Sequence, residues 1–572
     1  MGEKPSVFKR LMGGNKKGSF LSGAFILAVA GLLCKIIGAV YKIPLRNLIG
    51  EEAMGVYSAV YPIYTFLLVF STSGIPTAIS KLVAEERSKG NAGGAHRVFL
   101  SSLRLLFGIG AVTTLLMLLG SPLLSSILRI ESWQPVAAIA FSLLFVSLLS
   151  AYRGYFQGMQ NMVPTAVTQV VEQIIKLAAG FFFAIRWYRA DWGNIPSYVM
   201  GAAGALLGIT LSELAAFLLI FFLYQKNKHL LLTESERNEA PAYHAAKRLL
   251  QIAIPMTIGG AIKPLVDAID SLMIKSMMET YFGYNMEYID ALYGFLKSDC
   301  GTLINMPSVL TVALSMALVP AVSDALAGAN GKHEVKRITR TGLKLSLVIG
   351  LPCAIGFLTM AKEILSLLYI YVDKDYSGIF FSGADKLTTT AHFLMILAFG
   401  VLFLSVIQTA AGILQGIGKV TQPVVNLFIG MVIKVIMNVA LVPSTVFGMT
   451  GVPIGTVTCY AVAAVLDVMC VINFTHVNLS FKENLLRPLG ASAMMTAAIL
   501  LLKLPFRSLL AVPGTKAKLV TVGIIGLAAV VYFIGLAVFS VFDESDIALM
   551  PGGKKIEKLL NKLGVKVRPT EE

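Results

Sequence analysis

Charged side chains recur at helical spacing inside long apolar segments of this sequence. In the first apolar segment, Lys35, Lys42 and Arg46 are separated by seven and four residues, so a helix would align them along one stripe. Ionisable groups are costly inside a membrane and usually face a cavity or a partner. A cationic stripe beside a wet cavity would bind phosphate through charge-assisted hydrogen bonds. Alternatively, Lys42 and Arg46 lie near an interface and extend to water, whereas Lys35 is too deep to do so easily.

The seventh apolar segment repeats this spacing with mixed charges. Lys263, Asp267 and Asp270 stand at i, i+4 and i+7, and Asp299 begins the eighth segment. Lys263 and Asp267 are close enough on a helix to neutralise each other. Such a pair is either structural or part of a binding site, and the two roles are compatible.

Further acidic residues lie in the fifth, sixth and twelfth segments. Glu172 and Lys176 form a favourable i, i+4 pair, which favours a structural role. Glu213 in the sixth segment and Asp467 in the twelfth are either ion sites or polar contacts between helices.

The elements that must position these residues are membrane helices. Of the 572 residues 56% are apolar and 14% are charged, whereas a soluble chain carries about 25% charged residues. The mean hydropathy is +0.75. The net charge of +16 is interpreted as lysine and arginine facing anionic lipid, not nucleic acid. We therefore expect an all-α integral membrane protein with membrane lipids as its surroundings.

The hydropathy pattern predicts about fourteen membrane helices, since each needs about 20 mainly apolar residues. The predicted spans are 20–48, 55–83, 98–120, 135–158, 163–186, 197–224, 248–278, 300–327, 341–369, 390–415, 422–442, 451–474, 484–503 and 517–541.

Charge in the loops predicts that both termini are cytoplasmic. With the N-terminus inside, 28 of the 48 lysines and arginines fall in inside segments, as the positive-inside rule requires. Residues 1–19 form a basic tail and not a cleavable signal, because the apolar run that follows is too long and lacks a cleavage site. Residues 543–572 are a second basic tail, with apolar residues at helical spacing that suit either a surface helix or a frayed end.

The sequence also repeats itself. Gln157, Gly158, Pro164 and Lys176 correspond to Gln415, Gly416, Pro423 and Lys434, and both Gln-to-Lys spacings are 19 residues. Glu213 is matched with Asp467, and Pro76 with Pro320. These matches predict two parallel six-helix lobes, 20–224 and 248–474, joined by an inside loop 225–247 and followed by two additional helices, 484–541. Parallel repeats place a site between the halves.

Enzymatic and metal-binding signatures are missing from the sequence. The five cysteines show no paired spacing, and the six histidines are scattered without an HExxH motif. No Walker A sequence occurs, and the outer loops are too short to hold the catalytic acids of a membrane glycosyltransferase or polymerase. We therefore expect no cofactor, no metal and no catalytic residue.

Three stretches resemble a known family. Residues 34–57, with Cys34-Lys35-Ile36-Ile37-Gly38 and Tyr41-Lys42-Ile43-Pro44, are similar to the opening of the SpoVB/YtgP group of polysaccharide transporters. Residues 74–85 and the run Tyr152-Arg153-Gly154-Tyr155-Phe156-Gln157-Gly158 continue the similarity. The group belongs with MurJ-like lipid II flippases and MATE exporters in one superfamily, abbreviated MOP.

The resemblance implies two six-helix lobes around a cavity, with the last two helices forming a groove for a lipid tail. It places Lys35 at the family's cationic position in the first helix. The family's arginines in the second and eighth helices have no match in 55–80 or 300–320, so Lys263 is expected to supply charge instead.

The function this implies is a flippase of the bacterial plasma membrane. It would move a lipid-linked (polyprenyl-pyrophosphate) saccharide, such as the peptidoglycan precursor lipid II, by alternating access, driven by a coupling ion or the membrane potential. The alternative is a MATE-like drug or cation antiporter, which would favour an acidic cavity.

Overall fold

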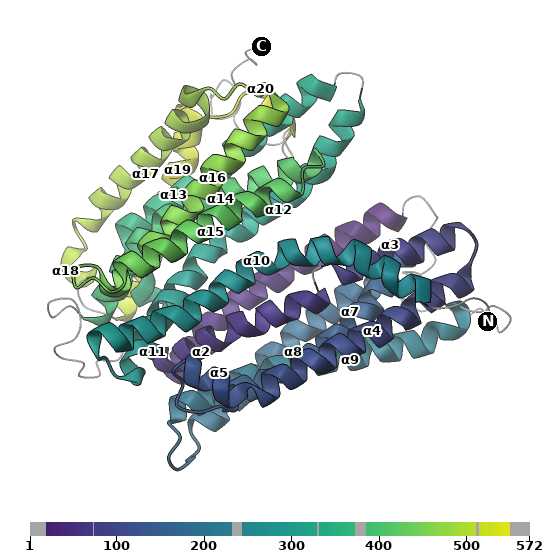
Figure 1. The fold of residues 1–572 in the computed structure, drawn as a ribbon. Helices are drawn as coiled ribbons and strands as arrows, with labels where there is room; N and C mark the ends of the chain where they lie inside the picture. The colour runs from purple at the N-terminus through teal and green to yellow at the C-terminus, as the bar shows by residue number, and fades with distance from the viewer. Residues whose placement is uncertain are drawn as a thin grey trace, which may run out of the picture. The chain divides into compact units, whose positions relative to one another are not determined.

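The computed structural model describes residues 19–72, 74–231, 243–328, 331–371, 385–510 and 514–549. These residues are almost entirely helical, which confirms the predicted fold class (Figure 1). The first half contains α2 (Ser19–Thr72), α3 (Ile75–Ser88), α4 (Ala92–Leu119), α5 (Ser121–Ile127), α6 (Gln134–Ala140), α7 (Ser142–Gly158), α8 (Val163–Tyr188), α9 (Ser197–Leu231), α10 (Tyr243–Phe282) and α11 (Met286–Gly294). The second half contains the π-helix η2 (Phe295–Cys300), α12 (Gly301–Ala327), α13 (Gly331–Leu368), α14 (Lys386–Gly416), α15 (Thr421–Leu441), η4 (Gly448–Thr450), α16 (Gly451–Thr475), η5 (Lys482–Leu486), α17 (Arg487–Lys503), α18 (Arg507–Leu510), α19 (Thr515–Val538) and α20 (Glu544–Leu549).

Twelve segments of the described chain are long and apolar enough to cross a membrane. The first of them, Ile36–Ser88, contains a kink at Gly50, whose φ of 87° is outside the helical range. This kink divides the segment into the first two predicted helices. Helix α10 is not among these twelve segments. Its 40 residues would span about 60 Å at the helical rise, which is longer than the hydrocarbon core of a membrane. The protein is therefore a multi-pass membrane protein with the predicted helices in the predicted order.

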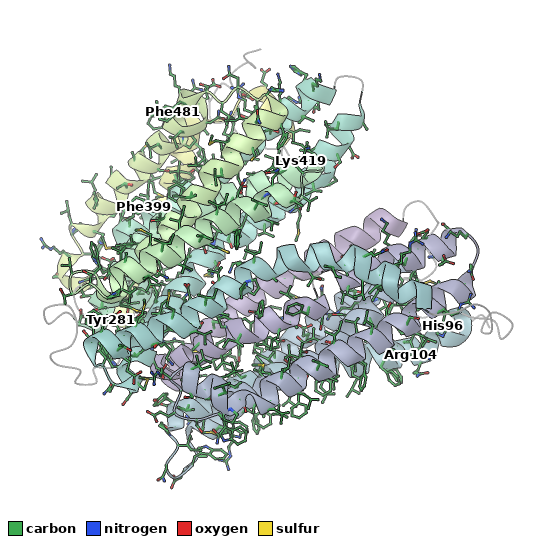
Figure 2. The ribbon with its side chains drawn as sticks, in the orientation of Figure 1. His96, Arg104, Tyr281, Phe399, Lys419 and Phe481 are labelled. Atoms are coloured by element: carbon green, nitrogen blue, oxygen red, sulfur yellow. The ribbon has the colours of Figure 1, made fainter. Side chains whose placement is uncertain are left out.

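The chain divides into two compact units between Gly294 and Phe295. Unit 1 contains α2 to α11, and its helix α10 packs against α2, α3 and α4. The seventh predicted helix thus lies with the first six, whereas the sequence placed the division after residue 224. Apolar and aromatic side chains of α3, α4, α7 and α9 form the core of this unit. His96, labelled in Figure 2, joins Phe99, Tyr152, Tyr155 and Tyr224 in an aromatic cluster within that core.

Unit 2 contains η2 to α20 and includes the two additional helices of the sequence prediction. The additional helices α17 and α19 pack against each other and on α13 through an apolar cluster around Met360 and Tyr532. In the first half of α13, the buried Lys344 forms ion pairs with Asp543 and Asp546. Because Asp543 precedes α20 and Asp546 lies within it, this charged contact fixes the end of the described chain to α13.

The eighth predicted helix begins earlier than the sequence suggested. It runs from α11 through η2 into α12, so residues 286–299, read as a loop from the sequence, are helical. The wide turn of a π-helix leaves backbone carbonyls without their usual partners. The Tyr369 hydroxyl donates a hydrogen bond to one of these, the carbonyl oxygen of Asp299, at 3.3 Å. The unit boundary coincides with the start of this π-helix.

Equivalent glycines reveal the register of the internal repeat. A Cβ on Gly154 would lie 2.8 Å from the Pro76 carbonyl oxygen, and a Cβ on Gly412 would lie 2.7 Å from that of Ser315. The neighbouring turn repeats the contact, with Gly158 facing Ser80 and Gly416 facing Val319. Likewise, Gly110 of α4 packs on Ser147 as Gly350 of α13 packs on Ser405. Equivalent helices of the two units therefore cross at equivalent glycines, in the same order along the chain.

This register corrects two of the matches made from the sequence. Pro76 corresponds to Ser315 and not to Pro320, because both carbonyl oxygens face the equivalent glycine. Gly204 contacts Phe183 of α8, and Gly451 contacts Leu441 of α15, seven residues after Lys176 and Lys434 respectively. The two glycines are therefore equivalent, which aligns Glu213 with Tyr460. Asp467 lies two helical turns beyond Tyr460 on α16, so it is not the counterpart of Glu213.

Candidate functional site

The cationic stripe of the first helix is divided by the fold. Lys42 is half-buried, whereas Arg46 is 1% exposed and forms an ion pair with Glu51, with 3.3 Å between Nη1 and Oε2. Arg46 is therefore buried in an ion pair, which differs from both expectations for it, a cation that lines a cavity and a side chain that extends to water. Lys35 is part of α2, but its side chain lies outside the described part of the structure.

Lys42 belongs to a cluster of lysines from three helices. It interacts electrostatically with Lys176 of α8 and Lys263 of α10. We call Lys42, Lys176 and Lys263 the lysine cluster. The side chain of Lys263 is 59% exposed, and its Nζ lies 2.7 Å from Oδ2 of Asp267, which confirms the expected i, i+4 pair. Ammonium groups donate charge-assisted hydrogen bonds, so side chains of this kind have the chemistry to bind a phosphate.

Tyrosine rings surround the two less exposed members of the lysine cluster. The ammonium of Lys176 lies 5.8 Å from the ring centroid of Tyr41 and 5.9 Å from that of Tyr61. The ammonium of Lys42 lies 6.0 Å from the ring centroid of Tyr57, which stacks on Tyr61. The faces of tyrosine rings attract cations, so these contacts offset part of the cost of desolvating the lysines. These contacts therefore favour a position inside unit 1 for the ammonium groups of Lys42 and Lys176.

Glu172 pairs with a residue that the sequence analysis did not select. Its Oε2 accepts a hydrogen bond from Nη2 of Arg153 at 2.9 Å, and Nε of the same guanidinium contacts Thr168 at 3.3 Å. Arg153, at the end of α7, therefore takes the place expected for Lys176. This leaves the Lys176 ammonium facing the tyrosines. The stretch Tyr152–Gly158 carried the family resemblance, but nothing in its spacing indicated a partner on α8.

Glu213 is a buried acid close to these groups. Its side chain is 8% exposed on α9, and its Oε2 has no hydrogen-bond partner among the described residues. It interacts electrostatically with Glu172, Arg153 and Lys176. A charge in this position is expensive without compensation, so the nearby cations are its natural counter-charges.

The remaining acids predicted from the sequence are dispersed. Asp270 is fully buried on α10 in unit 1. Asp299 is fully buried in η2, where its Oδ2 accepts a hydrogen bond from Tyr371 at 3.1 Å. Asp467 is fully buried on α16 and accepts a hydrogen bond from Asn426 at 2.8 Å. No group of three or more metal-ligating side chains occurs within the described ranges.

One buried ion pair was not predicted from the sequence. Lys275 of α10 and Asp290 of α11 are 0% and 1% exposed, with 2.5 Å between Nζ and Oδ1. The sequence placed Asp290 in a loop, so no pairing rule applied to it. A Cβ on Gly55 would lie 1.9 Å from the Asp290 carbonyl oxygen, so α2 and α11 touch through their backbones. The pair thus fixes α10 to a helix already held against α2.

Comparison with known proteins identifies the family. A model of the polysaccharide biosynthesis protein family matches residues 20–326, and the MatE family model matches residues 300–440. The chain belongs to the polysaccharide biosynthesis protein family. This confirms the resemblance stated from residues 34–57, 74–85 and 152–158.

Two curated relatives of this family come from Bacillus subtilis (strain 168). Stage V sporulation protein B is 26% identical over 477 residues, which cover 82% of this chain and 86% of that protein. Lipid II flippase MurJ is 26% identical over 442 residues, which cover 74% of this chain and 77% of that protein.

Solved structures agree with this placement in fold. An inward-closed lipid II flippase MurJ superposes with a TM-score of 0.63 at 15% identity, covering 90% of this chain and 98% of that one. An inward-facing multidrug resistance MATE family transporter of the MOP superfamily superposes with a TM-score of 0.64 at 15% identity, covering 77% of this chain and 94% of that one. This member of the polysaccharide biosynthesis protein family therefore shares the fold of those two transporters.

Proposed function

We propose that this protein is a membrane transporter of the MOP superfamily, a flippase that moves a polyprenyl-pyrophosphate saccharide, such as lipid II, from the inner to the outer leaflet. The observation that carries the proposal is the lysine cluster. A pyrophosphate head group needs fixed positive charge when it leaves water, because electrostatic attraction is much stronger at low dielectric. Three lysines from separate helices provide that charge in unit 1, and the relative named lipid II flippase MurJ supports the substrate class.

The two additional helices would accommodate the lipid tail. The described parts of α17 and α19 expose large apolar side chains, among them Leu501, Leu519, Phe533 and Val538. In a membrane such a surface contacts hydrocarbon at no cost, so a polyprenyl chain remains in lipid while the head group crosses. Alternating access to the head-group site would then complete the transfer.

We propose that a coupling ion or the membrane potential drives the transfer. Moving one elementary charge through 100 mV is worth about 2.3 kcal/mol, so an anionic head group responds to the membrane potential. We propose Glu213, Asp270, Asp299 and Asp467 as the residues at which a coupling ion would act, and Glu213 first. Its carboxylate lies within electrostatic reach of Lys176, so a proton or cation bound at Glu213 would leave the Lys176 ammonium free to pair with the pyrophosphate.

Replacing lysines of the cluster is expected to reduce flipping strongly. A charge-assisted hydrogen bond is worth about 1.5–3 kcal/mol, so Lys42→Ala or Lys176→Ala should lower head-group affinity about tenfold to hundredfold. Lys35→Ala should behave in the same way, because Lys35 is seven residues from Lys42 on α2. Arginine at these positions keeps the charge and should retain much of the activity. The measurement is flipping of a fluorescent lipid-pyrophosphate saccharide in proteoliposomes.

Lys89→Ala is the matched control, since its side chain is 54% exposed and lies at the end of α3. Equal amounts of folded protein are reconstituted for each variant. If the cluster variants flip the lipid at the wild-type rate, the lysine cluster does not contact the substrate. If the wild type instead exports cationic drugs and flips no such lipid, the MATE-like antiporter suggested by the match over residues 300–440 is the correct function.

We also propose that both termini are cytoplasmic. Both tails are basic, and the tail residues 1–18 and 550–572 lie outside the described part of the structure. With the native cysteines replaced, a single cysteine at either tail should resist a membrane-impermeant maleimide on intact cells and react after permeabilisation. Reaction on intact cells would refute the proposed orientation.

A further inference from the structure

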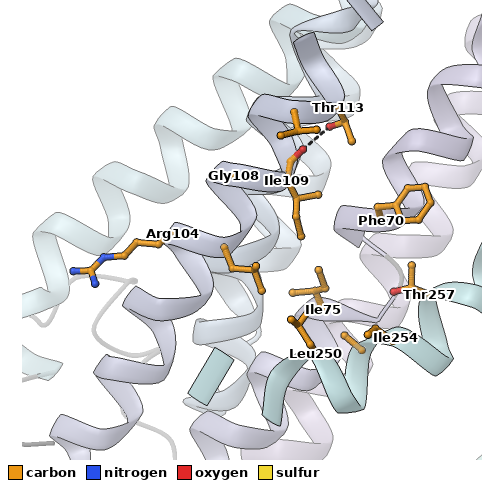
Figure 3. Close-up of a pocket in the computed structure, with 12 residues that line it drawn as sticks. Phe70, Ile75, Arg104, Gly108, Ile109, Thr113, Leu250, Ile254 and Thr257 are labelled. Carbon is orange, nitrogen blue, oxygen red and sulfur yellow. Dashed lines mark hydrogen bonds between the residues drawn. The ribbon is translucent and has the colours of Figure 1, made fainter. Parts of the chain in front are cut away.

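Unit 1 contains an apolar cavity that the proposed function does not use. Its volume is about 640 Å³, within the range of about 300–1,000 Å³ that is usual for small-molecule sites. Figure 3 shows its lining, which comes from the end of α2, the start of α3, one face of α4 and the first half of α10. The lining residues are Phe70, Ile75, Arg104, Leu105, Gly108, Ile109, Val112, Thr113, Leu250, Ala253, Ile254 and Thr257.

The sequence leaves this space open at two positions. The α2 helix ends at Thr72 and α3 begins at Ile75, so no continuous helix fills the gap beside α4. On α4, Gly108 contributes no side chain, and a Cβ there would meet no atom within 4 Å. The hydroxyl of Thr113 donates to the backbone of its own helix, to the carbonyl oxygen of Ile109 at 2.9 Å. It therefore presents its methyl group to the cavity.

Arg104 is the one charged side chain in the lining. It is exposed, and no ion pair holds it among the described residues. It lies twelve residues, about 18 Å along the helix, after the start of α4, and six residues inside the predicted membrane span 98–120. An arginine at such depth is costly unless an anion or the interface receives its charge. Figure 3 shows its guanidinium pointing away from the apolar side chains, so an anion at Arg104 would lie outside the apolar part of the cavity.

We propose that this cavity binds an anionic phospholipid of the surrounding membrane, with one acyl chain in the cavity and the phosphate on Arg104. An amphiphile fits because apolar walls and a single cation are adjacent. The transported pyrophosphate saccharide fits less well, because its head group carries more charge and many hydroxyls. The cavity lining offers one charged side chain, and it includes no member of the lysine cluster. The site is thus separate from the head-group site of the proposed function.

Native mass spectrometry of the purified full-length protein would test this site. The protein is exchanged into detergent with equal amounts of phosphatidylglycerol and phosphatidylcholine. The wild type should retain one phosphatidylglycerol in preference to phosphatidylcholine. Gly108→Leu should reduce that adduct at least tenfold, because its Cβ meets no atom within 4 Å and the side chain can occupy cavity space. Arg104→Ala should remove the preference for the anionic lipid, about tenfold to hundredfold, as expected for a charge-assisted hydrogen bond.

Gly523→Leu is the control, since its Cβ on α19 also meets nothing within 4 Å but lies outside the cavity. It should bind phosphatidylglycerol as the wild type does. Undiminished binding by Gly108→Leu, or equal loss with Gly523→Leu, would overturn the proposal. So would a retained adduct with the mass of a polyprenyl phosphate. Because the readout is bound lipid and not transport, the result is independent of whether the protein flips lipid II.

Discussion

Replacing Lys275 with methionine is expected to lower the free energy of unfolding by about 3–5 kcal/mol, because it strands a buried carboxylate. The side chains of Lys275 and Asp290 are 0% and 1% exposed, with 2.5 Å between the charged atoms. Removing the ammonium leaves Asp290 without its counter-charge beside the backbone contact between α2 and α11. Asp290→Leu alone should be similarly harmful, because the lysine then loses its partner. The measurement is SDS-driven unfolding in mixed micelles, followed by far-UV circular dichroism.

The double variant Lys275→Met with Asp290→Leu separates a lost charge pair from lost packing. Replacing a whole buried pair with apolar residues is often neutral or stabilising, so much of the lost stability should return. Lys89→Met, which removes a 54%-exposed lysine, should change stability by less than about 1 kcal/mol. If both single variants matched this control, the pair would not stabilise unit 1.

Leucine at Gly154 or at Gly412 is expected to destabilise the protein severely and to a similar extent. In both cases the new Cβ would lie under 3 Å from a backbone oxygen, of Pro76 at 2.8 Å and of Ser315 at 2.7 Å. Backbone cannot rotate away as a side chain can, so the helices α3 and α7, or α12 and α14, must separate. Overpacking costs about 1–3 kcal/mol and occasionally more, and contact with backbone favours the upper end.

Gly356→Leu provides the control, since a Cβ at Gly356 meets nothing within 4 Å on the membrane helix α13. Thermal unfolding monitored by size-exclusion chromatography after heating compares the three variants with the wild type. A large loss for Gly154→Leu with none for Gly412→Leu would show that the two crossings are not equivalent, and it would contradict the register assigned to the repeat.

The sequence by itself determined the fold class, the order of the helices and the family. The reason is that a bilayer imposes a length and an apolar composition on every spanning helix, and both can be counted along the chain. The parallel repeat was also visible, because Gln157-Gly158 and Gln415-Gly416 end equivalent helices. The register of the repeat along the sixth and twelfth helices was not visible in the sequence, because acids two turns apart occupy nearly the same face of a helix.

Only the tertiary structure decided which charges meet. Arg46 and Lys42 share a stripe in the sequence, yet Arg46 is buried against Glu51 and Lys42 joins lysines from α8 and α10. Glu172 is spaced correctly for Lys176 but pairs with Arg153 of another helix. Spacing along one helix restricts a side chain to a face, whereas its partner depends on which helix packs there and at what height. That packing is set by long-range backbone contacts, such as those at Gly55 and Gly154, which no local pattern encodes.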